Sequence, residues 1–98
     1  LPEKSLKDLP NEVEATVRSI DKGGPFKYVN KVGEFFYNKP NRQGQIVLPV
    51  KADSEYYQAY TVGTPGATTR GAQRVVVGKG GEKFYTPDHY DTFVKITD

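Results

Sequence analysis

Three side chains in the C-terminal half could supply chemistry to a surface: Arg70, Arg74 and His89, the only histidine of the chain. A guanidinium is always charged and binds phosphate oxygens through a planar fork of N–H donors. An imidazole can hold a proton near neutral pH and release it within one reaction cycle. Together they could bind an anion and transfer a proton, although two arginines near a strand are more often part of a solvated surface.

These side chains lie on or between segments with the pattern of an antiparallel meander. Apolar, β-branched and aromatic runs occupy residues 56–62, 74–77 and 83–86, and glycine-containing turns separate them. Side chains alternate between the two faces of a strand, so Ala59 is expected to share a face with Tyr57. One face can then form core while the other carries the chemistry.

One helix is expected before the meander. Its apolar stripe has helical spacing and consists of Leu9, Val13, Val17 and Ile20. Asp8 or Leu9 is expected to cap it, with Pro10 at the first helical position and Gly23 at its end. The stripe should cover the face of the sheet opposite Ala59 and Arg74. With short runs at 34–37 and 92–96, the predicted fold class is α+β: one N-terminal helix packed on a four- to five-stranded antiparallel sheet.

Composition fits one globular domain spanning residues 1–98, in which residues 1–8 are expected to be loosely ordered. The 98 residues are 36% hydrophobic and 12% aromatic. The absence of cysteine and the single histidine argue against a disulfide framework and a structural zinc site, and no metal or cofactor is expected. No apolar run approaches the ~18 residues of a membrane span. The net charge of +2 only mildly favours a polyanionic partner.

Two motifs make the chain similar to a known family. TPGATTRGAQR (64–74) followed by TPDHYDTF (86–93) resembles the barnase-like microbial guanyl-type ribonucleases, which are small secreted endoribonucleases. The segments LPNEVEATVRSI, GGPFKY and YYQAYTV extend the resemblance over residues 9–96. The resemblance implies a helix on an antiparallel sheet. It also implies cleavage of single-stranded RNA without metal, through a 2′,3′-cyclic phosphate.

The resemblance assigns roles to individual residues. Arg70 and Arg74 match the cationic clamp that stabilises charge on the phosphoryl oxygens. His89 matches the general acid that protonates the departing 5′-oxygen. Tyr90 matches a tyrosine that lines the phosphate site, and a packing role for it is equally open.

The general base departs from the family pattern. The family has a glutamate where this chain has Ala59, whose methyl group cannot accept a proton. Glu55 lies on the same face, but four strand residues place it ~13 Å away. Asp53, Asp88 and Asp91 match no catalytic position. The chain is therefore expected to be inactive or strongly impaired, through engineered inactivation of a toxic enzyme or natural loss, unless the alignment is misplaced.

The base-recognition loop is the second departure. Related enzymes carry an Asn-Arg-Glu-like run whose backbone donors and glutamate read the guanine edge, and here two registers compete. Residues 38–40 keep the distance from Phe36, whereas residues 41–44 keep the composition. Neither contains a carboxylate, so Gln43 is left as a neutral acceptor and the base preference is open. The expected substrate-binding residues are Phe36, Tyr37, Asn38, Asn41, Arg42, Gln43 and Tyr90.

These residues predict an endoribonuclease that acts on single-stranded RNA as a monomer without a membrane partner. Because the sequence starts at Leu1 without methionine, a processed secreted product or a toxin domain cut from a longer chain is expected. A toxin domain would be held in check by an acidic immunity or inhibitor protein. The alternatives are a non-catalytic RNA- or nucleotide-binding module and a protein-interaction domain whose basic cleft binds such an inhibitor.

Overall fold

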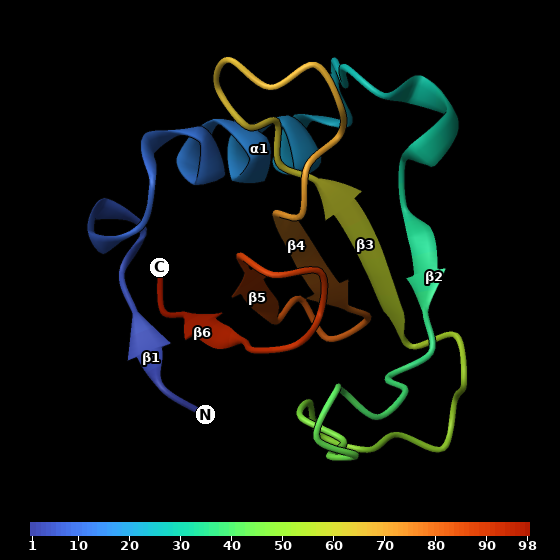
Figure 1. Cartoon of the computed structure of the whole chain (residues 1–98). Coiled ribbons are helices and arrows are strands. Elements are labelled where there is room, and N and C mark those ends of the chain that lie inside the picture. The colour runs from blue at the N-terminus through green and yellow to red at the C-terminus, as the bar shows by residue number, and fades with distance from the viewer.

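The computed structural model describes all 98 residues. It contains a single sheet of six strands (Figure 1). The strands are β1 (Glu3–Lys4), β2 (Glu34–Phe36), β3 (Tyr57–Thr61), β4 (Arg74–Gly78), β5 (Lys83–Thr86) and β6 (Val94–Ile96). Their order is β1-β6-β5-β4-β3-β2, and all neighbours are antiparallel except β1 and β6. The predicted α+β class is confirmed, whereas the predicted count of four or five strands is too low.

The first residues of the chain contact its C-terminal end. In the parallel pair of β1 with β6, Glu3 lies opposite Lys95. Asp98 accepts hydrogen bonds from the backbone N–H of Leu6 at 2.8 Å and from the Ser5 hydroxyl at 2.7 Å. A two-residue strand of charged residues has no hydrophobic period, so it could not be predicted from the sequence pattern.

The predicted helix is present as α1 (Asn11–Lys22), after a 3₁₀ turn η1 (Leu6–Asp8). Pro10 is its N-cap and not its first helical residue, a displacement of one position that is common at helix ends. The predicted end is confirmed: Gly23 has φ 80° and its N–H donates to the carbonyl oxygens of Ser19 and Ile20. This left-handed conformation suits glycine, which has no Cβ. The longest helix, α1, has 12 residues and is too short to span a membrane.

Each face of the sheet carries its own core. The α1 face contains Val13, Val17, Val62, Val75, Tyr85 and Ile96. The opposite face contains Leu48, Tyr57, Ala59, Val76, Phe84 and Phe93. Because residues alternate along β4, Arg74 lies on the same face as Val76. The prediction that the helix covers the face opposite Ala59 and Arg74 is therefore confirmed.

Long connections leave the sheet at two ends. Figure 1 shows the loop between β3 and β4 close to α1, whereas the loop between β2 and β3 lies at the far end of the sheet. A second 3₁₀ turn, η2 (Val29–Lys31), leads into β2. Loops carried by a rigid sheet are favoured positions for ligand recognition.

Candidate active site

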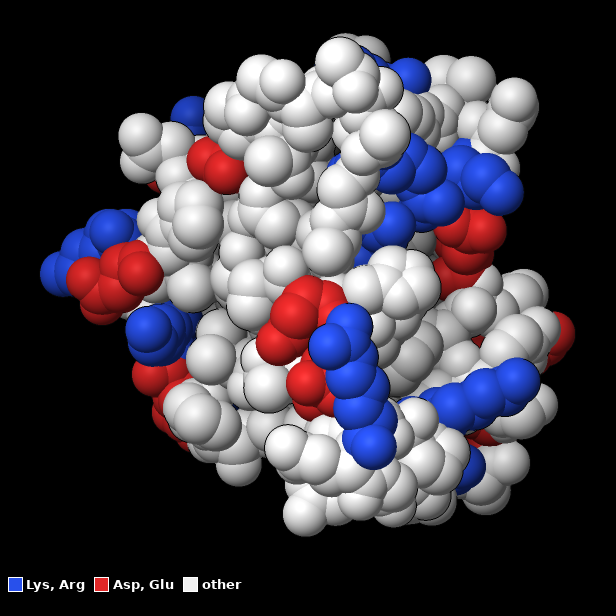
Figure 2. Space-filling view, in the orientation of Figure 1, with Lys and Arg blue, Asp and Glu red and all other residues white.

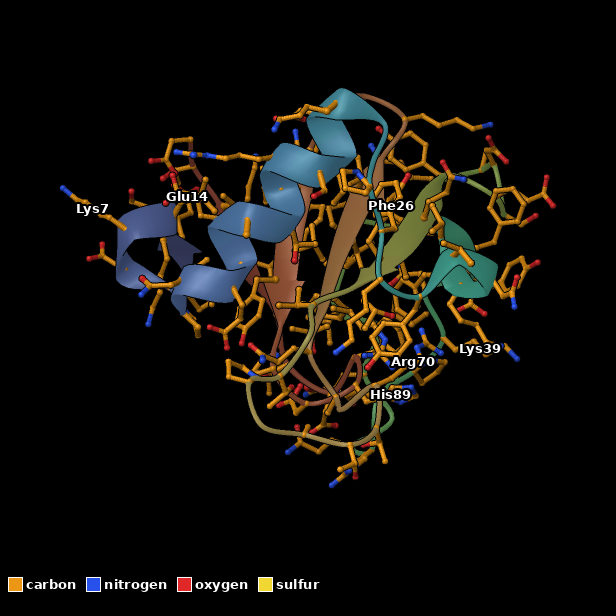
Figure 3. All side chains as sticks on the ribbon, turned by 90° about the horizontal axis from the view of Figure 1, so that it is seen from above. Lys7, Glu14, Phe26, Lys39, Arg70 and His89 are labelled. Atoms are coloured by element: carbon orange, nitrogen blue, oxygen red, sulfur yellow. The ribbon has the colours of Figure 1, made fainter.

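A cleft of about 580 Å³ brings together three segments that are distant in the sequence. The predicted site residues that line it are Phe36, Tyr37, Asn41, Arg42, Arg70, Arg74, His89 and Tyr90. Figure 3 shows Arg70 and His89 on the same side of the molecule, away from α1, with Lys39 pointing outward beyond them. The structure therefore assembles the predicted clamp and the predicted acid in one place.

Arg74 is the buried cation of this cleft. It is the first residue of β4 and is only 3% exposed. Its Nη1 donates to the carbonyl oxygens of Gly71 at 3.0 Å and Gln73 at 2.7 Å, while its Nε is buried without a partner. Burial and the neighbouring Arg70 lower the pKa of the Arg74 guanidinium, which Tyr90 and Glu34 partly offset. Arg74 is thus a fixed positive charge whose donors are not all used by the protein.

Arg70 is held from two sides. Its Nε and Nη2 donate to the Thr61 hydroxyl at 3.0 and 2.8 Å, and Nη2 also donates to Oε1 of Glu34 at 3.1 Å. The next residue, Gly71, has φ 69°, and a Cβ there would lie 2.6 Å from the hydroxyl oxygen of Thr64. Only glycine fits this turn without a shift. The turn sets Arg70 beside Arg74 with its charge facing the cleft.

His89 is presented by an unusual stretch of backbone. His89 and Tyr90 have φ values of 55° and 76°, both in the left-handed region. The N–H of His89 donates to the carbonyl oxygen of Ala72 at 2.9 Å, and that of Tyr90 donates to the Thr86 hydroxyl at 3.0 Å. Non-glycine residues held in this region often occur at functional sites. The imidazole of His89 is exposed to solvent and lines the cleft.

Asp88 holds the loop that presents His89. Its carboxylate accepts hydrogen bonds from the Thr86 hydroxyl at 2.9 Å and from the backbone and hydroxyl of Thr92 at 2.8 and 2.6 Å. Burial alone would raise the pKa of Asp88, but these hydrogen bonds outweigh it and lower the pKa below its usual value. The ionised carboxylate therefore stabilises the folded loop.

Replacing Asp88 by asparagine is expected to lower the free energy of unfolding by about 1–3 kcal/mol at pH 7, because an amide nitrogen cannot accept these bonds. Because the pKa of Asp88 is lower in the folded state, its ionised carboxylate contributes stability at pH values above the unfolded pKa. This contribution is lost as the pH falls through the folded pKa. The difference between the two proteins should therefore shrink as the pH is lowered through the acidic range. Urea unfolding at pH 7 and pH 3 measures it, with the exposed Asp21→Asn as control. A difference that persists unchanged at pH 3 would contradict this role.

Tyr90 both packs and lines the cleft. Its ring stacks on Phe36 with centroids 4.6 Å apart and lies 6.4 Å from Phe93. Burial raises the pKa of the Tyr90 phenol, and the positive charge of Arg74 partly offsets this. The sequence left open whether Tyr90 packs in the core or lines the site, and in this structure its ring does both.

The recognition loop contributes residues of both predicted registers to the cleft: Lys39 and Pro40 from the first, Asn41 and Arg42 from the second. Asn38 lies beneath it, with φ 55° and Nδ2 donating to the carbonyl oxygen of Leu48, and does not line the cleft. Oδ1 of Asn41 accepts the N–H groups of Gln43 and Gln45. Gln43 is exposed and lies outside the cleft. Neither Asn38 nor Gln43 lines the cleft in this structure, and their contact with the substrate stays a prediction.

Several cleft residues were not among the predicted site residues: Glu34, Phe35, Lys39, Pro40 and Asp91. Glu34 is directly opposite Ala59 in the β2–β3 pairing, whereas Ala59 itself is only 3% exposed and does not line the cleft. Figure 2 shows basic side chains gathered beside acidic ones on this part of the surface, near β2. No group of three or more His, Cys, Asp or Glu side chains is placed to hold a metal ion.

Comparisons with known proteins agree on one family. A family model described as ribonuclease matches residues 2–97. Guanyl-specific ribonuclease St of Saccharopolyspora erythraea is 50% identical over 88 residues, which are 90% of this chain and 80% of that protein. Guanyl-specific ribonuclease Sa of Kitasatospora aureofaciens is 43% identical over 92 residues, covering 93% and 88%. The structure of ribonuclease Sa2 in complexes with mononucleotides superimposes with a TM-score of 0.86 at 40% identity, covering 100% of this chain and 95% of that one. These similarities confirm the resemblance found in the sequence.

Proposed function

Because this chain belongs to the family of guanyl-specific microbial ribonucleases, which are endoribonucleases, we propose that it cleaves single-stranded RNA through a 2′,3′-cyclic phosphate without metal. The observation that supports this most is the convergence of Arg70, Arg74 and His89 on one cleft. Ribonuclease Sa2 has been solved with mononucleotides, and a nucleotide is the ligand we propose for this cleft.

The two arginines supply the charge stabilisation that the reaction needs. Attack of the ribose 2′-oxygen on phosphorus adds negative charge to the phosphoryl oxygens, and fixed donors in a partly buried site stabilise it without reorganising. Arg74 is buried and Arg70 is fixed by Thr61, so their guanidinium groups keep their positions before substrate arrives. Positive charge at the phosphate therefore does not require a bound cation.

His89 supplies the proton to the leaving group. In the first stage its imidazolium protonates the 5′-oxygen as the P–O5′ bond breaks, and a base takes the proton of the 2′-OH. In the second stage the neutral imidazole takes a proton from water, which opens the cyclic phosphate while the protonated base returns its proton to the 2′-oxygen. Ala59 removes the carboxylate from the family's base position, so cleavage is expected to be impaired relative to a chain with glutamate there.

The loop around residues 37–42 would select which nucleobase of the RNA is bound. Asn41 is fixed by its bond to the carbonyl oxygen of Asp91 at 3.0 Å, and the N–H of Arg42 donates to a carboxylate oxygen of Asp91 at 3.1 Å. The loop has no carboxylate of its own, so discrimination for guanine should be weaker than in a site with a charge-assisted pair. Sequencing the cleavage ends of a mixed-sequence RNA would measure it.

An RNase that needs no cofactor would also degrade the RNA of the cell that makes it. We therefore propose that the chain acts outside that cell, as a secreted enzyme or a delivered toxin domain. An acidic inhibitor protein is the matching partner, because the cleft exposes Lys39, Arg42 and Arg70 together. Such charge complementarity would accelerate association at low salt.

A second candidate function is nucleotide binding without catalysis, and Ala59 is the observation that favours it. This module would keep the phosphate contacts of Arg70, Arg74 and His89. It would bind guanosine nucleotides but leave RNA intact. Measuring binding and cleavage on the same preparation separates the two functions.

Replacing Arg74 by lysine is expected to weaken binding of guanosine 3′-monophosphate about 10- to 150-fold and to slow RNA cleavage. Lysine keeps the charge but loses the planar fork, and hydrogen bonds to charged groups contribute about 1.5–3 kcal/mol. Calorimetric titration measures binding, and a fluorescent RNA with chelator present measures cleavage. Arg18→Ala on the exposed face of α1 is the control. Unchanged affinity in Arg74→Lys would remove this residue from the site, and no cleavage by the native chain would favour the binding module.

A further inference from the structure

The pairing of β2 with β3 places the acidic side chain of Glu34 beside Ala59, where the family has its catalytic glutamate. Glu34 is the direct antiparallel partner of Ala59. Residues directly opposite each other share a face of the sheet, with Cβ atoms about 4.5–5.5 Å apart. Phe36, two residues along β2, packs with Phe93 in the core of that face, which confirms the face on which Glu34 lies. Glu34 thus lies on the strand next to the family's base position and directly opposite it.

The side chain of Glu34 points into the cleft. Its Oε1 accepts a hydrogen bond from Nη2 of Arg70 at 3.1 Å, and Oε2 lies 3.9 Å from Nζ of Lys31. Glu34 lines the same cleft as Arg74 and His89, and its side chain is 42% exposed. The carboxylate is therefore both oriented by the clamp and accessible to a substrate hydroxyl.

The other carboxylates near this face are occupied or outside the cleft. Both oxygens of Asp88 accept bonds from threonines, and Asp53 pairs with a lysine outside the cleft. Glu55 is exposed and does not line the cleft. Asp91 does line it, but one of its oxygens accepts a backbone N–H of the recognition loop. Glu34 is the carboxylate that contacts the phosphate clamp.

The order of the strands sets Glu34 and His89 on different sides of the clamp. Arg74 begins β4, Glu34 begins β2 two strands away, and His89 follows β5 on the other side of β4. Neighbouring strands are about 4.8 Å apart, so β2 and β4 are separated by roughly 10 Å. A base and an acid that act on opposite sides of one phosphorus atom must lie on opposite sides of the clamp, as the strand order places these two residues.

We propose that Glu34 is the general base of this chain and replaces the glutamate missing at Ala59, an inference that rests on the proposed ribonuclease function. A phosphate bound by Arg70 competes for the Nη2 that holds Oε1 of Glu34. The released oxygen takes the proton of the 2′-OH while the 2′-oxygen bonds to phosphorus, the P–O5′ bond breaks, and His89 gives its proton to the 5′-oxygen. In hydrolysis of the cyclic phosphate the protonated Glu34 returns its proton to the 2′-oxygen.

A purely structural role for Glu34 predicts the opposite sign. If Glu34 only restrained Arg70, it would be a negative charge in a site for a polyanion. Neutralising it would then leave RNA cleavage unchanged or increase it, because repulsion of phosphate is removed. Loss of cleavage together with unchanged or tighter nucleotide binding is therefore specific to a role in proton transfer.

The test is Glu34→Gln, which keeps an oxygen acceptor for Arg70 and removes only the charge and the ability to take a proton. We expect kcat/KM for a fluorescent single-stranded RNA to fall about 10²–10³-fold, the usual range for a positioned base. Affinity for guanosine 3′-monophosphate should be unchanged or higher. Glu55→Gln is the matched control and should cleave at the native rate, and circular dichroism confirms the fold of each variant.

The pH profile gives a second readout. The rise of kcat/KM on the acidic side should disappear in Glu34→Gln, while the fall at higher pH set by His89 should remain. Lys31 lies beside Glu34, and the other charged and titratable groups of the cleft are Lys39, Arg42, Arg70, Arg74, His89, Tyr90 and Asp91. Asp91 is the one other carboxylate among them, and both proteins contain it, so an acidic limb that disappears only in Glu34→Gln belongs to Glu34.

Including His89→Ala separates failure of the inference from failure of the proposed function. If His89→Ala loses cleavage while Glu34→Gln cleaves at the native rate, the ribonuclease function stands and Glu34 is not the base. If the native chain does not cleave RNA at all, both proposals are overturned. A fall in cleavage matched by an equal fall in nucleotide affinity would assign Glu34 to binding and also reject its role as base.

Discussion

Replacement of His89 by alanine is expected to lower kcat/KM for single-stranded RNA by about 10²–10⁴-fold, because a positioned general acid contributes that range. The ribose 5′-oxygen is a poor leaving group unless it is protonated as the bond to phosphorus breaks. The exposed imidazole of His89 lines the cleft with both arginines, and its loop is fixed through Ala72 and Asp88. No other side chain of the cleft is an imidazole.

A substrate with an activated leaving group tests this role directly. A nucleoside 3′-phosphate ester of nitrophenol releases a stable phenolate, so its cleavage needs little help from an acid. His89→Ala should therefore lose much less activity on this ester than on RNA. Lys22→Ala, on the last turn of α1, is the control. An equal loss on both substrates would show that His89 binds or positions the substrate and does not donate the proton.

The predicted site residues that the structure brings together in one cleft lie in motifs that contain their own hydrogen-bond partners. The turn containing Gly71 fixes where Arg70 lies relative to Arg74, and both residues fall within one short motif. The loop that presents His89 is closed by Asp88 and Thr86, which belong to the same eight-residue motif. A motif that includes its own hydrogen-bond partners can be interpreted without knowledge of the rest of the fold.

The parts that the sequence did not predict depend on pairings between distant segments. Glu34 and Ala59 were both placed on apolar runs, but the long connection between them does not fix which residues of the two strands face each other. The carboxylate near Ala59 along the chain is Glu55, whereas the carboxylate opposite it across the sheet is Glu34. Strand β1 was missed for the same reason, because its pairing with β6 joins the two ends of the chain.

The recognition loop shows a different limit. Its composition suggested that Gln43 reads the base, yet the side chain of Asn41 folds the loop by accepting two of its backbone N–H groups. The same polar residue type can bind a ligand or close a turn, and only the three-dimensional partner decides between them. Here the closed turn leaves Asn41 and Arg42 at the cleft and Gln43 outside it.

Introducing glutamate at Ala59 is expected to have an effect that depends on Glu34. In the Glu34→Gln background, Ala59→Glu should raise RNA cleavage about 10²–10³-fold, because it returns a proton acceptor to a site that has none. In the native background the gain should stay below about tenfold. Glu34 already supplies the base there, and two carboxylates directly opposite each other on paired strands repel.

The four proteins form a double-mutant cycle, in which non-additive effects measure the coupling of the two positions. Ala59→Gln in each background is the matched control, since it has the same size as glutamate but cannot take the proton. Ala59 is buried, so circular dichroism and urea unfolding must show that each variant keeps the fold. Equal gains from Ala59→Glu in both backgrounds would mean that Glu34 contributes no proton transfer. A gain confined to the Glu34→Gln background would show that the two strands offer alternative positions for one carboxylate, because either glutamate can then take the proton of the same 2′-OH.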